Sequence, residues 1–396
     1  MRNFLKHYLI TILMSAFIVW PAKAWISYEH SEMGDIAFRT AIAALDKSAT
    51  GAGQRIFEQP LIWNKHEAIG AVANNQLITS FSFGQLVAIY GDYALNVGEL
   101  NSLDFAPRVN SLKTIVSGIN STKFSAEHAH MKALAISNPT HFSLRAAQQY
   151  TKFHRLALQT VREDPRRLWQ ALHYEAIAVH SLTDLFALGH MLEDRQLTEE
   201  VFNWANSQSS ISPLSKANRR ALAEIAGKAM GGHVNFNHNA HNWKGSMMMN
   251  LAGFTWRGYG DGKYRIVDAT CSARTLWGKR KCSDRKTDAQ RKIIVHATML
   301  SILDILKVAS GLETSLRNEF HAICYVPVRY WDTQAPVPPE NQLQELWKLR
   351  SAMNSAGRPI EEHGFDFSLG YLKFESTELR GNVDYIDYIK QHCNLP

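Results

Sequence analysis

The segment AVHSLTDLFALGHM, residues 178–191, constrains the fold more than any other part of this 396-residue chain. The spacing of its apolar residues suits a buried helix. It nevertheless carries three ionisable side chains, His180, Asp184 and His190. An unpaired carboxylate in a protein core costs on the order of several kcal/mol, so a fold that buries this helix has to supply Asp184 with partners.

The spacing of these three residues indicates a metal site. His180 and Asp184 are four residues apart, so on a helix they lie on one face, where two side chains can bind the same ion. If the helix continues to His190, that residue is rotated by roughly 80° and displaced by roughly 15 Å from His180, and we expect it to bind a different ion. A core histidine with an aspartate cap is the alternative interpretation of any one residue. The three together favour a shared cation, and imidazole with carboxylate suits Zn²⁺.

The remainder of the chain predicts a mainly α fold. Amphipathic periodicity predicts helices over residues 31–47, 82–91, 141–161, 165–189, 196–206, 214–230 and 285–311. A hairpin is predicted within 254–267, where two β-like runs flank Gly-Asp-Gly. After Leu312 the sequence changes to short β-like runs and a Pro-rich stretch. We therefore expect a helical domain over 25–315 and a smaller β-rich or α+β module over 316–396.

Residues 1–24 have the pattern of a secretory signal peptide. Arg2 and Lys6 precede an apolar run of about thirteen residues, too short to cross a bilayer, and an A-x-A site follows at 22–24. Cleavage there makes Trp25 the first residue of a secreted protein, extracellular or periplasmic. The formal net charge falls from +7 to about +4. Most basic residues are scattered, so we interpret them as solvated surface and not as a polyanion-binding face.

The four cysteines all lie in the C-terminal third of the chain. In an exported protein an even number predicts disulfides. The short loop between the first two favours the pairs Cys271–Cys282 and Cys324–Cys393 among three possible pairings. A cysteine-metal site is the alternative, and it is disfavoured because no C-x-x-C spacing occurs.

Further candidate metal ligands lie outside the apolar helix. His30 follows Trp25 by five residues. The freed amine of Trp25, with a pKa of about 8, can lose its proton and bind zinc while its own carbonyl oxygen completes a chelate. His141, in NPTHF, lies at the start of an amphipathic helix. Three more histidines are grouped in one segment: His233, His238 and His241.

Together these residues resemble the phospholipase C/P1 nuclease superfamily, all-helical secreted enzymes with three clustered zinc ions. Within it they are most similar to the phosphatidylcholine-hydrolysing phospholipases of the Pseudomonas and Legionella type. The resemblance covers about residues 25–265. It rests on Trp25 with His30, Gly91-Asp92-Tyr93, residues 138–142, the H-x3-D-x5-H pattern that starts at His180, and the His233 segment leading into WRGYGDG.

The resemblance implies how two of the zinc ions are bound. His141, His180 and Asp184 would bind the first ion, with Asp92 beside it as a further ligand or as the general base. The amine and carbonyl of Trp25, the ring of His30 and the other oxygen of Asp184 would bind the third ion. Asp184 would therefore bridge two ions.

The second ion is where the chain departs from the family. His190 and His233 would bind it, and in the family a carboxylate follows the last histidine by four residues. Here Asn237 has that position; its amide oxygen could bind weakly, or Asp261 could complete the site. Two alternatives to His233 remain, His238 followed by Asn242 and His241 followed by Gly245.

The function that the resemblance implies is a phospholipase C. It would split glycerophospholipids, phosphatidylcholine above all, into diacylglycerol and a phosphorylated headgroup at a membrane surface or micelle, because zinc makes water a nucleophile near neutral pH. A single-strand nuclease, which needs an aromatic slot for a base, is the first alternative, although no specific nucleic-acid partner is expected. A secreted binding protein stabilised by its metals is the second. The other histidine and glutamate residues that could be considered as metal ligands are interpreted as structural: His128, His130, His154, His173 and Glu175.

Overall fold

A computed structural model describes residues 27–63, 68–73, 76–102, 105–117, 127, 139–192, 245–260, 274–275, 278–279, 288–312, 320–331 and 383–393. This part of the chain is mostly helical with small antiparallel sheets, which confirms a mainly α class at that level. The predicted signal peptide and the predicted helices 196–206 and 214–230 lie outside the described residues.

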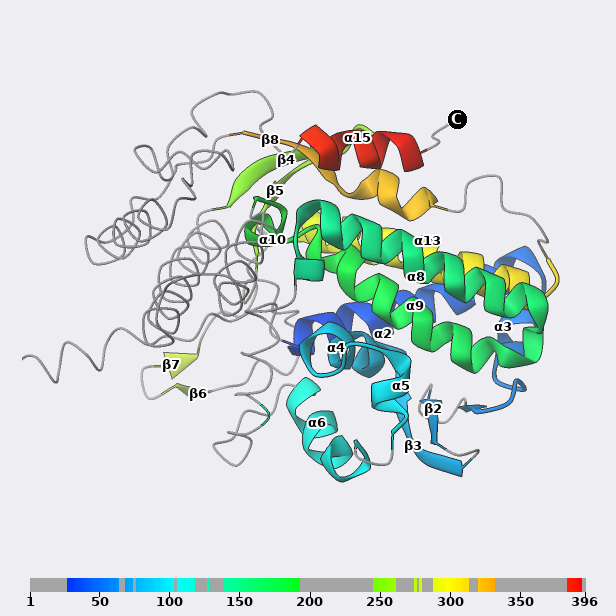
Figure 1. Cartoon of the computed structure of the whole chain (residues 1–396). Helices are drawn as coiled ribbons and strands as arrows, with labels where there is room; N and C mark the ends of the chain where they lie inside the picture. The colour runs from blue at the N-terminus through cyan, green and yellow to red at the C-terminus, as the bar shows by residue number, and fades with distance from the viewer. Residues whose placement is uncertain are drawn as a thin grey trace, which may run out of the picture.

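Long helices lying side by side form the body of the molecule (Figure 1). They are α2 (Ser27–Ser48), α8 (Ser143–Glu163), α9 (Leu168–Asp184) and α13 (Asp288–Ala309). Helix α4 (Phe83–Asp92) packs against both α2 and α9. Shorter helical segments connect them: α3 (Ala52–Ile56), α5 (Val97–Leu100), η2 (Ala106–Arg108), α6 (Val109–Val116), η4 (Pro139–His141), η5 (Pro165–Arg167), α10 (Leu188–Leu192) and η7 (His321–Tyr325).

The helices α2, α4, α8 and α13 confirm the sequence-based ranges to within a few residues. The predicted helix 165–189 is instead divided. The Asp164 side chain accepts a hydrogen bond from the backbone N–H of Arg166, and Pro165 fits the first turn of η5, from which α9 continues. The helix α9 ends at Asp184, and a turn separates it from α10.

Two small sheets flank the helices. The first has the antiparallel order β1–β2–β3 and was not expected from the sequence: β1 (Ile62–Trp63), β2 (Ala68–Ala73) and β3 (Gln76–Ser82). The second has the order β5–β4–β8: β4 (Ser246–Asn250), β5 (Thr255–Gly258) and β8 (Pro327–Trp331). A separate pair joins β6 (Arg274–Thr275) to β7 (Gly278–Lys279). Strand β5 lies in the predicted hairpin, but 261–267 is outside the described residues.

The described C-terminal elements pack onto the helical body. Strand β8 pairs with β4, and α15 (Val383–His392) packs against α8 and η7. The disulfide Cys324–Cys393, one of the two predicted pairs, ties the end of α15 to η7; Cys271 and Cys282 lie outside the described residues. Packing is therefore continuous across the expected boundary near residue 315. No helix in the described part is long and apolar enough to cross a membrane.

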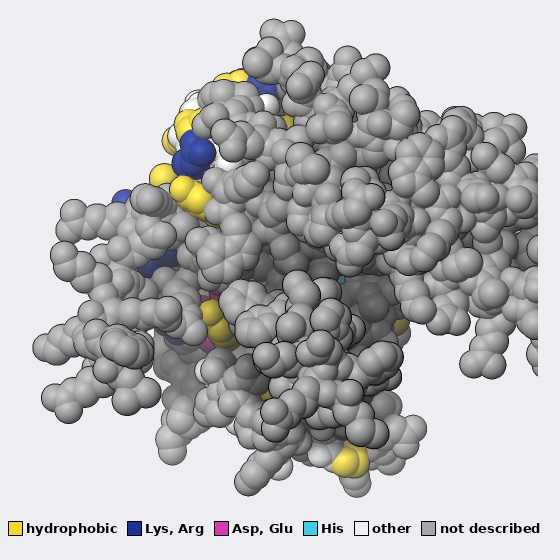
Figure 2. Space-filling model, turned by 90° about the vertical axis from the view of Figure 1, so that its left-hand side faces the viewer, with side chains coloured by type: hydrophobic (Ala, Val, Ile, Leu, Met, Phe, Trp, Pro, Cys, Tyr) yellow, Lys and Arg dark blue, Asp and Glu magenta, His cyan; other side chains and the backbone are white. Residues whose placement is uncertain are grey.

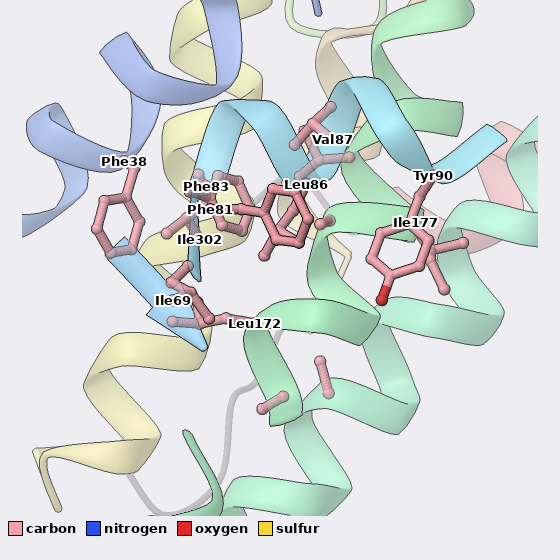
Figure 3. Close-up of a cluster of buried hydrophobic side chains, with 14 of the residues drawn as sticks. Phe38, Ile69, Phe81, Phe83, Leu86, Val87, Tyr90, Leu172, Ile177 and Ile302 are labelled. Atoms are coloured by element: carbon pink, nitrogen blue, oxygen red, sulfur yellow. The ribbon is translucent and has the colours of Figure 1, made fainter. Parts of the chain in front are cut away.

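Two clusters of buried apolar side chains hold these elements together. The first joins α2, β2, β3, α4, α9 and α13 (Figure 3). The second joins α8, the end of α9, α13 and the C-terminal elements. Helix α9 contributes Ile177 and Val179 to the first and Ala178 and Leu182 to the second. A helix that packs on all sides needs apolar residues all round, which explains the composition of the 178–191 segment.

The crossing of α2 and α4 brings backbone unusually close to backbone. A Cβ at Gly84 would collide with the carbonyl oxygen of Ser31, so only glycine permits this approach. The carboxylate of Asp35 holds the crossing, because it accepts hydrogen bonds from the Gly84 N–H at 2.7 Å and the Ser82 hydroxyl at 3.0 Å. This contact places the N-terminal turn of α2, which carries His30, against α4 and α9.

Candidate metal centre

The carboxylate of Asp184, at the last residue of α9, lies at the centre of a buried group of histidines. Asp184 is 0% exposed and the histidines are at most 5% exposed. They come from four separate segments of the chain: His30, His141, His180 and His190. Figure 2 shows only a small cyan histidine area on the face that it presents, as expected for buried rings.

One oxygen of the Asp184 carboxylate faces the residues predicted for the first ion. Oδ2 lies 2.7 Å from Nδ1 of His141 and 3.3 Å from Nε2 of His180. These two ring nitrogens are 3.1 Å from each other. The i,i+4 spacing in α9 and the turn η4 thus bring His141, His180 and Asp184 together.

The other oxygen of Asp184 faces two further histidines. Oδ1 lies 3.5 Å from Nε2 of His30 and 3.3 Å from Nδ1 of His190. The ring of His30 stacks on that of His180 at 4.1 Å between centroids. The expected displacement of His190 along a continuous helix is wrong, because α9 stops at Asp184 and the turn over 185–187 directs α10 back toward the carboxylate.

Backbone carbonyls fix the protons of two of these rings. Nδ1 of His180 lies 2.9 Å from the carbonyl oxygen of Val87, and Nε2 of His141 lies 3.2 Å from that of Gly91. A carbonyl oxygen only accepts, so each of these ring nitrogens carries the proton and donates. In a neutral ring the lone pair is then on the inner nitrogen, which faces Asp184; that nitrogen of His141 lies at hydrogen-bond distance from Oδ2, so it can hold a proton or a metal ion there.

Hydrogen-bond acceptors also fix one proton on each of the other two rings, those of His30 and His190. The hydroxyl of Thr183 donates to main-chain carbonyls of α9, so it accepts from Nδ1 of His30 at 2.8 Å and leaves the lone pair on Nε2. Nδ1 of His190 donates to the carbonyl oxygen of His141 at 3.0 Å, which leaves the lone pair of His190 on Nε2. Metal-binding histidines commonly have their outer N–H held in this way.

The pKa shifts show how strongly these groups interact. Burial lowers the pKa of His180, but the carboxylates of Asp184 and Asp92 outweigh it and raise that pKa to about 9. Burial raises the pKa of Asp184, yet the rings of His190, His180 and His141 hold it well below its ordinary value. Asp184 is therefore ionised, and the site favours positive charge.

The arrangement fits bound metal ions. Two groups, His30–His180–Asp184 and His141–Asp184–His190, each bring ligand atoms within 4.8 Å of one another. Lone pairs and a carboxylate oxygen that face one another at about 3 Å repel unless a positive charge lies between them. Oδ1 of Asp184 has no hydrogen-bond partner in the described part of the chain. These buried groups could therefore hold a metal ion.

Asp92 reaches the cluster from a kink at the end of α4. The helix breaks at Tyr90 and at Gly91, whose φ is 95°, and a Cβ at Gly91 would collide with the ring of His180. Asp92 is 3% exposed, and its Oδ2 has no hydrogen-bond partner among the described residues. Burial raises the pKa of Asp92, while the rings of His180 and His141 act in the opposite direction.

The remaining predicted site residues lie outside the described part of the chain: Trp25, His233 and Asn237, with the alternatives His238, His241 and Asp261. Sequence reasoning missed Thr183, which holds the ring of His30. Its signal was present in HSLTD, where a hydroxyl lies inside an apolar helix between two candidate ligands. The carbonyls of Val87 and Gly91 leave no trace in the sequence. Two expected structural residues, His154 and His173, lie in separate hydrogen-bond networks.

Comparison with protein-family models, with curated proteins and with solved structures finds no match.

Proposed function

We propose that this protein is a secreted, zinc-dependent phosphodiester hydrolase that acts on glycerophospholipids as a phospholipase C. The observation that carries the proposal is the Asp184 carboxylate, which has two histidine nitrogens near each oxygen, while His30, His141 and His180 each also bond to an acceptor on the far side of the ring. Nitrogen and carboxylate ligands of this kind suit zinc. A hydrolase that acts on a phosphodiester benefits from ions that share one carboxylate.

The contacts of the described residues support part of the ligand set, and the family resemblance implies the rest. His141, His180 and Oδ2 of Asp184 would hold one ion, and His30 with Oδ1 of Asp184 would hold another, together with Trp25. His190 would hold a further ion with His233 and Asn237. Bound zinc would supply a Lewis acid that activates water near neutral pH and neutralises charge on phosphoryl oxygens.

The chain's own groups would handle the proton and the geometry. Oδ2 of Asp92, which has no hydrogen-bond partner among the described residues, would accept the proton of an attacking water, and its raised pKa makes it a better base than an exposed aspartate. Val87, Gly91 and Thr183 hold the rings of His180, His141 and His30 in fixed orientations. The ligands then need little reorganisation during the reaction.

The preference for lipid over nucleic acid rests on the resemblance to phosphatidylcholine-hydrolysing phospholipases. The signal-peptide pattern of residues 1–24 supports export to a compartment where lipid surfaces are met. A single-strand nuclease with the same metal centre is the second candidate. A binding protein that keeps its metals for stability is the third.

One assay on two substrates tests the proposal. The zinc-loaded chain beginning at Trp25 is given phosphatidylcholine in mixed micelles and, separately, single-stranded DNA. We expect diacylglycerol and phosphorylated headgroup, loss of this activity with a strong chelator and recovery with Zn²⁺. Mononucleotides without diacylglycerol would overturn the phospholipase assignment and leave the metal centre intact. A zinc-loaded chain that cleaves neither substrate would favour the binding protein.

A further inference from the structure

A buried hydrogen-bonded chain connects the first sheet with the kink of α4. His173, on α9, is 0% exposed. Its Nε2 lies 2.9 Å from the carbonyl oxygen of Gly70 on β2, and its Nδ1 lies 2.6 Å from the hydroxyl of Tyr90 on α4. These two hydrogen bonds therefore join β2, α9 and α4 through the ring of His173.

The direction of both hydrogen bonds is fixed. The carbonyl of Gly70 only accepts, so Nε2 of His173 donates. Burial lowers the pKa of His173 to about 4, so the ring is neutral and its Nδ1 accepts. The hydroxyl of Tyr90 carries its proton near neutral pH and donates to the lone pair of His173 Nδ1. Tyr90 is thus the donor and Nδ1 of His173 the acceptor of this hydrogen bond.

Tyr90 is the residue from which α4 departs from helical geometry. Its ψ is 128°, and Gly91 follows with φ 95°. The next carbonyl, that of Gly91, accepts from His141, and the next side chain is that of Asp92. The ring of Tyr90 packs in the first apolar cluster (Figure 3), and its hydroxyl, at the end of the ring, makes the hydrogen bond to His173. The bond to His173 therefore restrains the segment that presents both groups to the centre.

We propose that His173, acting through Tyr90, is a positioning residue of the metal centre, one that links the β1–β3 sheet to the orientation of Gly91 and Asp92. The inference rests on the metal centre of the proposed function, and it assigns to that centre two residues that touch none of its ligand atoms. The proposal requires that loss of the Tyr90–His173 hydrogen bond lowers the affinity for metal under conditions where the protein remains folded.

His154 provides a matched control on the neighbouring helix α8. It is equally buried, and its Nδ1 lies 2.8 Å from Oε2 of Glu175, on the same helix as His173. The hydroxyl of Ser301, on α13, also bonds to Glu175. This network joins α8, α9 and α13, and its described hydrogen bonds reach neither α4 nor a candidate metal ligand. A substitution of His154 therefore measures the loss of stability on removing a buried, hydrogen-bonded histidine, without a change in the segment of Tyr90, Gly91 and Asp92.

The test measures Zn²⁺ affinity by competition with a chelator in the full chain, together with thermal unfolding. Tyr90→Phe and His173→Leu should each weaken binding of at least one ion by about ten- to a hundredfold, at a temperature where the chain stays folded. His173→Gln keeps one donor and one acceptor and should recover most of the affinity. His154→Leu should lower the unfolding temperature and leave Zn²⁺ affinity unchanged.

Each other outcome is decisive. A Zn²⁺ affinity equal to that of the wild type in Tyr90→Phe and His173→Leu would overturn the positioning role. It would not contradict the metal centre itself. Equal losses of affinity in His154→Leu would overturn it too, because the effect would then be general destabilisation. If His173→Leu does not fold, Tyr90→Phe, which removes a single hydroxyl, decides alone. A wild-type chain that binds no Zn²⁺ would overturn the proposed function itself.

Discussion

The buried carboxylates of Asp184 and Glu175 lie on the same helix, and both contact histidine, yet their surroundings differ in kind. Glu175 accepts hydrogen bonds from Nδ1 of His154 and from the hydroxyl of Ser301, so its partners bring their own protons to it. Around Asp184 the rings of His30, His141 and His180 each direct one N–H outward, to the hydroxyl of Thr183 or to a main-chain carbonyl.

The comparison shows what distinguishes a candidate metal site from a buried ion pair. Both places have a fully buried carboxylate beside histidine, since Glu175 and Asp184 are each 0% exposed, but one histidine contacts Glu175 and four surround Asp184. The difference is the destination of the imidazole N–H groups. Where a carbonyl takes the outer proton, the inner nitrogen of a neutral ring offers a lone pair, which a metal ion or a second proton can take.

Removal of the charge on Asp184 should produce the largest effect. Asp184→Asn keeps the size of the side chain but removes the charge that makes two nearby cations tolerable. We expect loss of both adjacent metals and a fall in hydrolysis on the order of a thousandfold or more. Metal analysis and initial rates measure this. Glu175→Gln is the control and should lower stability with full metal content; equal metal loss in both variants would break the comparison.

Substitution at Gly91 should have the next largest effect. In Gly91→Ala the new Cβ meets the ring of His180, and alanine is strained at φ 95°. Metal bound by His180 and His141 should be lost together with activity. Gly253 has φ 83° and no atom near its Cβ position, so Gly253→Ala carries similar backbone strain of about 1 kcal/mol and should bind metal normally. Normal metal content in Gly91→Ala would contradict the assigned position of His180.

The Thr183 hydroxyl should have a smaller, local effect. Thr183→Val keeps the shape of the side chain but removes the acceptor for Nδ1 of His30. The ion bound through His30 should become about ten- to a hundredfold weaker, while the ion bound through His141 is retained. Thr183→Ser restores the hydroxyl and should restore the affinity. A Thr183→Val chain with unchanged Zn²⁺ titration would show that the ring of His30 needs no such support.

The last prediction concerns stability and not metal content, through a third kind of buried histidine, His173, which contacts neither a carboxylate nor a candidate ion. Its folded pKa of about 4 lies below the unfolded value of about 6.5. The unfolded chain therefore binds a proton between pH 6.5 and 4 that the folded chain does not, and stability falls as pH is lowered through this range. The loss should reach about 3 kcal/mol in the free energy of unfolding.

The measurement is denaturant unfolding of the metal-free chain at pH 7 and pH 4, so that metal release does not contribute. In His173→Gln, which has no proton to gain, the loss over this range should be smaller by about the same 3 kcal/mol. An identical pH dependence in the two chains would show that His173 is accessible to protons in the folded state.

Sequence alone predicted the parts of this molecule that depend on local pattern. The helices α2, α4, α8 and α13 follow from apolar periodicity, and the spacing of His180 and Asp184 gave their shared face. The hairpin of β2 and β3 was missed, and so was the end of α9 at Asp184. The end of α9 depends on tertiary contacts, since α9 is packed on all sides and nothing in its apolar sequence marks a stop. The pairing of β2 with β3 is local in sequence.

The candidate site was predictable to the level of residue types and chain order. His30 and His141 could be named because histidines are few and the resemblance orders them. Which Asp184 oxygen each ring faces, and which nitrogen carries the lone pair, depend on the carbonyls of Gly91 and Val87 and on the hydroxyl of Thr183. Main-chain acceptors have no residue type, so no sequence pattern reveals them.

Anomalous X-ray scattering at the zinc edge, from crystals of the zinc-loaded chain beginning at Trp25, tests the central claim most directly. The account predicts three zinc ions per chain, two of them bound by the two oxygens of Asp184 at about 2.0–2.2 Å, with the ring N–H groups still directed to Val87, Gly91 and Thr183. Absence of zinc beside Asp184, with protonated imidazoles bonded to its carboxylate in the way that His154 bonds to Glu175, would contradict it.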